Sequence, residues 1–252
     1  STLVDRIVPG YPRAEIEDYN NKLDYQDNLI VAAEPFFLWA IEGGEALKAK
    51  LPFHKTNLNV KIVDDIRPFK MIKVRILNGA HTAMVPISLL YGNKLVMETV
   101  DGSFTGPFVN SVISEISGTL DMDKNEIQAY SEEVMDRFKN PFIKHALADI
   151  ALNSISKFKV RVLPSLLGYY NANKKLPVNL TFSLASLIQF YKGTWNNEAL
   201  PVKDTPELVE AFKDAWKLGA LDSVVAKVLA NTDFWGEDLT KINGLSEALV
   251  VA

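Results

Sequence analysis

Cysteine is absent from this sequence, which excludes disulfides and thiolate metal sites. No apolar run approaches the roughly 20 residues of a membrane-spanning helix, and the first residues lack the apolar core of a secretory signal peptide. Basic and acidic residues nearly balance, 27 against 31, which argues against broad binding to nucleic acid or anionic membranes. We therefore expect a cytoplasmic protein whose partners include neither nucleic acid nor membrane.

Phosphate-binding glycine patterns are also missing. The chain contains no G-x-G-x-x-G, and Gly43-Gly44 lacks the strand-turn-helix context of a dinucleotide fingerprint. Asp64 and Asp65 have no second histidine or carboxylate at a spacing useful for a metal. Acids at a helix N-terminus interact favourably with its dipole, so we assign these two a capping role and predict no metal site.

Apolar residues at helical spacing dominate the remaining pattern. The 252 residues suffice for one large domain or two small ones. We predict a mainly α fold with minor β, in one domain and roughly 60% helical, above the average for globular chains. The predicted strands are 30–34 and 58–66, and the predicted helices are 67–90, 104–119, 123–139, 141–156, 180–193, 206–218, 221–230 and 239–251.

The stretch from Lys73 to Met84 concentrates polar groups on an apolar helix face. At about 100° per residue, with Lys73 at 0°, His81 falls at about 80° and Asn78 at about 140°. The apolar Leu77 and Met84 lie in the same sector, so burial of that face would also bury an ammonium, a carboxamide and an imidazole.

This combination suits the interconversion of an alcohol and a ketone. Burial disfavours the charged form of Lys73, so its pKa should fall toward neutrality, and the neutral amine can accept a hydroxyl proton. Asn78 can donate hydrogen bonds to a developing oxyanion, and His81 can orient the hydroxyl. The alternative is structural: Lys73 extends to water, Asn78 bonds locally and His81 is a core histidine.

Two further groups are candidates for substrate binding. Glu34, beside the aromatic cluster 36–41, can orient Lys73 or a substrate hydroxyl; the alternative is a solvated loop charge. Segment 157–162 carries Lys157, Lys159 and Arg161, which share one face if the segment is extended. Such cations can bind a carboxylate, and Lys144 and His145 would add positive potential. The alternative is a solvated basic edge.

Several stretches in fixed order resemble the polyol-specific long-chain dehydrogenases, the mannitol dehydrogenase family. Lys73, Asn78 and His81 match its Lys-x4-Asn-x2-His signature. The other matching stretches, which continue to about Pro164, are Val4-Asp5-Arg6, Glu34-Pro35-Phe36 with Trp39 to Glu42, Val63-Asp64-Asp65-Ile66, and Arg137-Phe138-Lys139-Asn140-Pro141. The wording is most similar to the branch of this family that acts on the hexuronate-derived sugar acids altronate and tagaturonate.

The resemblance implies that residues 1–252 are a multi-helical C-terminal domain, similar to that of 6-phosphogluconate dehydrogenase. In the family, a Rossmann domain precedes it and holds NAD. We therefore expect a catalytic half that is inactive alone, with that dinucleotide-binding domain and a small sugar acid as its partners. The resemblance makes Lys73 the general base and acid, and Asp5 a contact to substrate hydroxyls.

One position departs from the mannitol enzymes. An arginine resembling their polyol-contacting one would fall near Ala148 or Asp149, and neither is basic. A shift from a neutral polyol to a sugar acid would produce such a change.

Alternative functions stay open at this point. The chain could belong to a related mannitol or fructuronate/mannonate dehydrogenase, or be a sugar-acid binding domain without redox chemistry. It could also be a hydro-lyase or isomerase in which Lys73 and His81 abstract a proton without a nicotinamide.

Overall fold

The computed structural model describes residues 1–13 and 15–252 and is mainly helical, with 57% helix and 8% strand. The predicted fold class is therefore confirmed. Contacts divide the chain into two compact units. The first contains Ser1–Lys73 and Asn140–His145, and the second contains Val74–Lys139 and Ala146–Ala252. None of the described helices is both long enough and apolar enough to cross a membrane.

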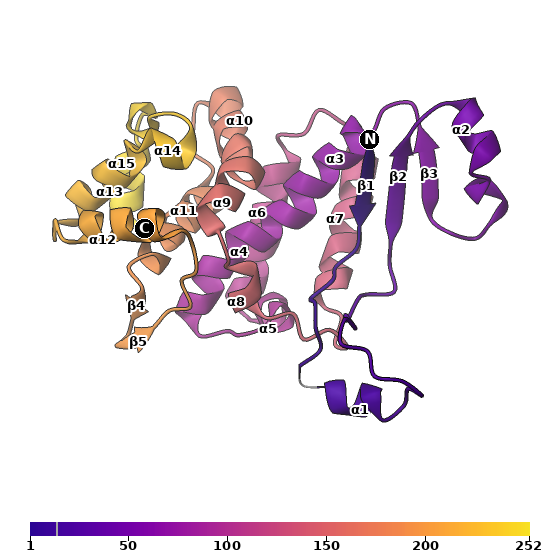
Figure 1. The fold of residues 1–252 in the computed structure, drawn as a ribbon. Coiled ribbons are helices and arrows are strands. Elements are labelled where there is room, and N and C mark those ends of the chain that lie inside the picture. Colours follow the sequence, from indigo (N-terminus) through magenta and orange to yellow (C-terminus); the bar gives the residue numbers. More distant parts are fainter. Residues whose placement is uncertain (14) are drawn as a thin grey trace. The chain divides into compact units, whose positions relative to one another are not determined.

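A three-stranded sheet organises the first unit (Figure 1). Its strands are β1 (Thr2–Asp5), β2 (Leu38–Glu42) and β3 (Val60–Val63); β2 pairs antiparallel with β1 and parallel with β3. The sequence predicted β3 within 58–66 but neither of the other strands. In β2, Ala40 and Ile41 are buried, so consecutive residues turn inward and the alternation that signals a strand is lost.

The strand predicted at 30–34 is wrong. Ala32 forms only a single bridge, with Gly10. Leu29 and Val31 are exposed, by 88% and 56% of their surface, so these side chains do not pack into the core as those of a buried strand would. A short apolar run cannot by itself distinguish a strand from a loop that covers other residues.

Short helices complete the first unit: α1 (Ile16–Asn20), α2 (Glu45–Lys50), the 3-10 turn η1 (Phe53–Lys55) and α3 (Arg67–Ile72). Neither Asp64 nor Asp65 is the N-cap of α3: that position is Ile66, which makes no side-chain cap hydrogen bond. Asp65 stands one residue earlier. Its Oδ1 accepts the backbone N–H of Arg67 at 2.8 Å, and hydrogen bonds from Arg67 lower the pKa of Asp65.

The helix predicted over 67–90 is present but is not a uniform α-helix. After α3, residues Lys73–Leu77 form a π-helical turn, η2, and α4 runs from Asn78 to Tyr91. Gly92 ends α4 with a φ of 105°, a conformation that disfavours any residue with a side chain. The uniform 100° spacing used to place Lys73, Asn78 and His81 is therefore wrong.

Helix α4 is the centre of the second unit, and every residue from Gly79 to Ser88 is buried. Four helices pack on it: α6 (Thr105–Ser117), α8 (Leu147–Ile150), α9 (Ser154–Arg161) and α11 (Val178–Phe190). A Cβ on Gly79 would lie 3.2 Å from Ile116 Cδ1 and 3.3 Å from the Arg161 carbonyl oxygen. Glycine at this position thus permits the close approach of α6 and α9.

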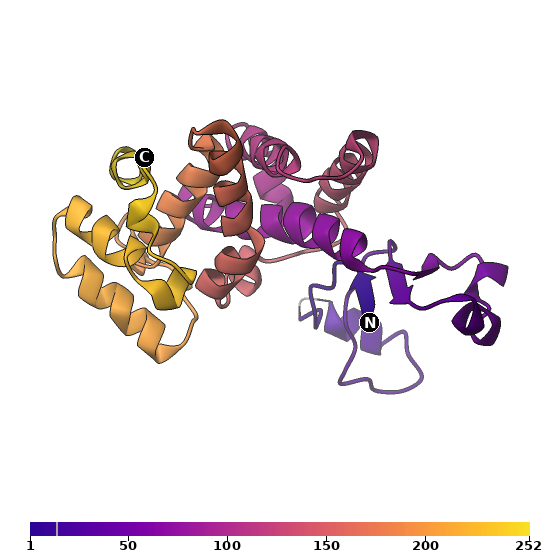
Figure 2. The same ribbon diagram turned by 90° about the horizontal axis from the view of Figure 1, so that it is seen from above.

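Other helices begin where capping residues predict. Asp123 accepts the N–H groups of Asn125 and Glu126 at the start of α7 (Lys124–Phe138). Thr205 accepts the N–H of Leu208 at the start of α12 (Pro206–Trp216). The later helices form an orange-to-yellow group in Figures 1 and 2. The remaining elements of this unit are α5 (Val96–Asp101), α7 (Lys124–Phe138), α10 (Leu163–Asn173), β4 (Thr194–Trp195), β5 (Glu198–Ala199), α12 (Pro206–Trp216), α13 (Leu221–Leu229), α14 (Thr232–Trp235), η3 (Leu239–Lys241) and α15 (Leu245–Val251).

Two predictions around residue 150 are wrong. Residues 141–146 are not helical, so the helix predicted over 141–156 is reduced to α8 and the start of α9. The segment predicted to be extended is the helix α9. Ile155, Phe158 and Val162 are all buried at helical spacing, and the Phe158 ring lies edge-on to Trp235. Burial of these apolar side chains decides the period of the segment.

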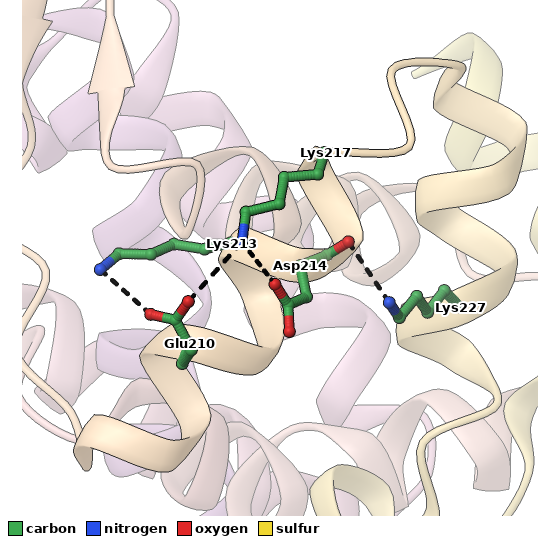
Figure 3. Close-up of polar contacts among 5 residues, drawn as sticks. All are labelled: Glu210, Lys213, Asp214, Lys217 and Lys227. Atoms are coloured by element: carbon green, nitrogen blue, oxygen red, sulfur yellow. Dashed lines mark hydrogen bonds and ion pairs between the residues drawn. The ribbon is translucent and has the colours of Figure 1, made fainter.

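Exposed ion pairs lie along α12, and one hydrogen bond links this helix to α13 (Figure 3). Lys217 lies 2.7 Å from Asp214 and 3.7 Å from Glu210, and Lys227 of α13 donates to the Asp214 carbonyl oxygen. The hydrogen bond that Lys217 donates to the Asp214 carboxylate raises the pKa of Lys217. Water screens all of these charges, so we assign them little weight in stability.

The packing of α9 predicts the cost of removing its buried ring. Phe158→Ala should lower the free energy of unfolding by about 3–5 kcal/mol, because a fully buried aromatic side chain leaves a cavity. Phe142→Ala is the matched control: its ring is 94% exposed, and its loss should cost less than about 0.5 kcal/mol. Urea unfolding measures both, and equal losses would contradict this account of the core.

Candidate functional site

In the first unit, two candidate carboxylates are buried. Asp5, the last residue of β1, and Glu34 are each 1% exposed. Glu34 Oε1 accepts the backbone N–H of Ile7 at 2.5 Å, and its carbonyl oxygen accepts Nε of Arg6 at 2.8 Å. The alternative of a solvated loop charge at Glu34 is therefore wrong. Instead, this residue fixes the chain that directly follows Asp5.

Lys73 and His145 are half-buried members of the first unit. Lys73 begins the π turn η2. Lys144 was expected to add positive potential, but its Nζ lies 2.9 Å from Glu15 and the hydrogen bond to this carboxylate raises the pKa of Lys144. Because Glu15 neutralises that charge, Lys144 contributes little to an anion site.

In the second unit, Asn78 and His81 stand at the start of α4. Asn78 is half-buried, and its backbone carbonyl accepts the Thr82 hydroxyl at 2.8 Å. His81 is 6% exposed, and its ring stacks on Phe138 with centroids 4.3 Å apart. Stacking limits the orientation of the imidazole plane, which both a core histidine and a hydroxyl-orienting histidine require.

Helix α9 brings Arg161 to α4. Its Nη1 lies 3.4 Å from the hydroxyl of Thr82, the residue that follows His81. Burial lowers the pKa of Arg161, and no carboxylate in the described part of the chain offsets that shift. A half-buried guanidinium without a carboxylate is suited to bind an anion.

The other two cations of α9 are placed differently. Lys157, one turn before Arg161, donates to the Ile150 carbonyl oxygen at 2.9 Å. Burial and then the charge of Arg161 lower the pKa of Lys157, while Asp204 opposes them. Lys159 instead reaches the Asp233 carbonyl oxygen. Because α9 is a helix, Lys159 lies on a different face from Lys157 and Arg161. An extended strand would have placed all three cations on one face.

Arg75 is a residue that sequence reasoning missed. It lies in the π turn, is half-buried, and donates from Nη1 to the Ser165 hydroxyl at 3.2 Å. Burial lowers the pKa of Arg75, again with no offsetting carboxylate in the described residues. The available signal was a lone arginine among the apolar residues 74–77.

Tyr191 anchors the start of α9, and this too was not foreseen. Its hydroxyl donates to Asp204 Oδ2 at 2.5 Å and accepts the backbone N–H of Ile155. Burial and then the bond to Asp204 raise the pKa of Tyr191 far above its ordinary value of 10.0. The pair thereby holds the helix that presents Lys157 and Arg161.

Comparison with known proteins identifies the family. Residues 65–252 match the mannitol dehydrogenase C-terminal domain. The chain belongs to the mannitol dehydrogenase family. The resemblance seen in the sequence motifs is thus confirmed, and the relatives named below are oxidoreductases.

Curated relatives refine the comparison. The chain is 44% identical over 252 residues to an altronate oxidoreductase of Yersinia pestis (strain Nepal516), covering 98% of this chain and 52% of that protein. It is likewise 44% identical over 253 residues to an altronate oxidoreductase of Shigella flexneri, with the same coverage. The chain therefore spans about half the length of the curated relatives it matches.

Solved structures show the same fold. Mannitol 2-dehydrogenase of Pseudomonas fluorescens, in a ternary complex with NAD and D-mannitol, superimposes with a TM-score of 0.83 at 21% identity, covering 100% of this chain and 50% of that one. A substrate-free D-sorbitol dehydrogenase gives a TM-score of 0.69 at 18% identity, covering 100% of this chain and 51% of that one. The predicted C-terminal-domain fold is therefore confirmed.

The Tyr191–Asp204 bond predicts a pH-dependent stability. Since the folded-state pKa of Tyr191 is raised, its contribution is complete below about pH 10, the unfolded value, and is lost as pH rises above it. Tyr191→Phe should lower the free energy of unfolding by about 1–3 kcal/mol at pH 8, and the gap to wild type should narrow above pH 10.

Urea unfolding across this pH range measures the effect. Tyr25→Phe is the control, because Tyr25 is 64% exposed and its loss should leave both the stability and its pH dependence unchanged. A gap between wild type and Tyr191→Phe that stays constant up to pH 11 would contradict the assignment.

Proposed function

We propose that residues 1–252 are the C-terminal substrate and catalytic domain of an NAD-dependent oxidoreductase that interconverts altronate and tagaturonate. The observation that carries this proposal is 44% identity to altronate oxidoreductases across 98% of the chain. The unneutralised guanidinium of Arg161 supports it, because it favours a substrate with a carboxylate over a neutral polyol.

In the proposed reaction, the chain handles the proton. Neutral Lys73 Nζ accepts the proton of the substrate hydroxyl, and its ammonium returns that proton to the carbonyl oxygen in the reverse direction. The bound nicotinamide would supply the redox chemistry at the same carbon, as hydride acceptor in oxidation and as hydride donor in reduction. Lys73 is half-buried, so part of its side chain is removed from water.

The other candidate residues would hold the reacting oxygen and the rest of the substrate. The carboxamide of Asn78 donates to the developing alkoxide, and His81, its ring stacked on Phe138, orients the hydroxyl. Asp5 accepts hydrogen bonds from other substrate hydroxyls. Glu34 keeps the segment after Asp5 in place through its bond to Ile7.

The substrate carboxylate would bind chiefly to Arg161. Its side chain reaches α4 one residue beyond His81, and a guanidinium can bind a carboxylate through two parallel hydrogen bonds. Lys157 adds positive potential one helical turn away, and His145 adds a further donor. Lys157 is the weaker candidate, because the Ile150 carbonyl already accepts its hydrogen bond.

The described residues do not themselves fit a dinucleotide. The glycine pair that follows β2 leads into α2, a helix of only six residues. A Cβ on Gly43 would lie 2.5 Å from the Leu47 side chain, so this glycine serves close packing of the turn. We therefore assign NAD binding to the dinucleotide-binding half of the complete protein, and predict that residues 1–252 alone do not turn over substrate.

The role of Lys73 predicts a loss of turnover. In the complete protein, Lys73→Ala should lower kcat by about 10²–10⁴-fold with altronate or tagaturonate, because general acid–base catalysis contributes this much. Substrate binding should persist. The assay screens altronate, tagaturonate, fructuronate and mannitol with NAD and with NADP.

Each alternative function has its own outcome in this screen. Preferred turnover of mannitol or fructuronate would assign the chain to a related dehydrogenase. Sugar-acid binding without turnover would identify a binding domain, and turnover without nicotinamide would identify a lyase or isomerase. Any of the three would overturn the proposal.

The role of Arg161 predicts selective loss of acid substrates. Arg161→Met should lower kcat/KM for tagaturonate about 10–100-fold, since a hydrogen bond to a charged group contributes about 1.5–3 kcal/mol. Any residual turnover of mannitol, which lacks the carboxylate, should be unchanged. Lys159→Met is the matched control on α9, because Lys159 bonds to the Asp233 carbonyl away from Arg161. An equal loss in both variants would remove Arg161 from the site.

A further inference from the structure

We infer that the π turn Lys73–Leu77 is a positioning element whose additional residue rotates Lys73 onto the face of the helix that carries Asn78 and His81. This inference rests on the proposed function of the same three residues. It adds a reason why the lysine and the asparagine are separated by four residues.

The turn is a local exception in an otherwise α-helical segment. The regular helices α3 and α4 precede and follow it directly. The Val74 carbonyl oxygen lies 3.7 Å from the ideal Cβ position of Gly79, five residues later, as expected where the helix is widened to i→i+5 bonding. Such turns are rare, short and frequent at functional sites.

The consequence for the three side chains follows from helix geometry. In a regular α-helix, Asn78 lies about 140° from Lys73 and His81 about 80° from it. A π turn accommodates one additional residue, which sets every later residue back by about 100°. Asn78 then lies about 40° on one side of Lys73 and His81 about 20° on the other. By this arithmetic, the Cα–Cβ directions of the three residues fall within a sector of about 60° around the helix axis.

The same arithmetic places Val74 off that face. If the segment were a regular α-helix, position 74 would align with Asn78 and His81, four and seven residues later, and position 73 would not. The π turn reverses these assignments. The two geometries therefore make opposite predictions for a lysine moved by one residue.

The experiment exchanges the two residues in the complete protein. K73V/V74K keeps the composition and the length of the helix and moves only the ammonium. We expect kcat for tagaturonate reduction to fall about 10²–10⁴-fold, to the level of Lys73→Ala. KM, the circular dichroism spectrum and Tm should stay near wild type. Wild-type kcat in K73V/V74K would overturn the inference.

Deletion of Val74 is the complementary variant. It places Lys73 four residues before Asn78, where a regular α-helix restores an angle of about 40° without a π turn. We expect kcat within about tenfold of wild type and an unchanged pH profile of kcat. A folded deletion variant with the kcat of Lys73→Ala would overturn the inference, and if this variant does not fold, K73V/V74K alone decides.

Lys73→Ala separates failure of the inference from failure of the proposed function. If Lys73→Ala retains wild-type kcat, Lys73 is not the base and the proposed function fails. If Lys73→Ala is inactive but K73V/V74K is active, Lys73 keeps its function and only the role of the π turn fails.

Discussion

Burial of the middle of α4 is the constraint on which the second unit depends. Every residue from Gly79 to Ser88 is buried, and α6, α9 and α11 pack against the helix. A buried helix must satisfy its polar groups internally. Thr82 accordingly bonds to the Asn78 carbonyl, and Ser183 of α11 to the Ala83 carbonyl. Such packing leaves little freedom at the start of α4, where Asn78 and His81 stand.

Charge is placed at the edge of this core at a cost in stability. Arg75 and Arg161 are half-buried, and burial lowers the pKa of both. Each guanidinium group donates a hydrogen bond to a hydroxyl group. Hydroxyl groups do not neutralise a charge, so these sites are poorly explained by stability. The carboxylate substrate proposed for Arg161 would compensate this positive charge.

Local signals in the sequence were sufficient for most helices. Asp123 and Thr205 cap the helices that they were expected to begin, and Gly92 ends α4 in a left-handed conformation. Prediction failed where distant contacts decide. The strand β2 is recognisable only through its partners β1 and β3, and the helical period of α9 follows from burial of Phe158 against Trp235.

In the candidate site too, the sequence identified the residues but not their arrangement in space. The Lys-x4-Asn-x2-His spacing was enough to select Lys73, Asn78 and His81 through the family resemblance. It did not yield their arrangement, because a regular helix of that spacing points the amine about 140° away from the carboxamide. A π turn has no compositional signature comparable to a glycine cap or a proline. Yet a gap of four residues between two groups proposed to face one substrate is itself informative. Three intervening residues place two side chains on one face of an α-helix, whereas four do so only if the helix accommodates an additional residue. In this chain, the turn Lys73–Leu77 absorbs it.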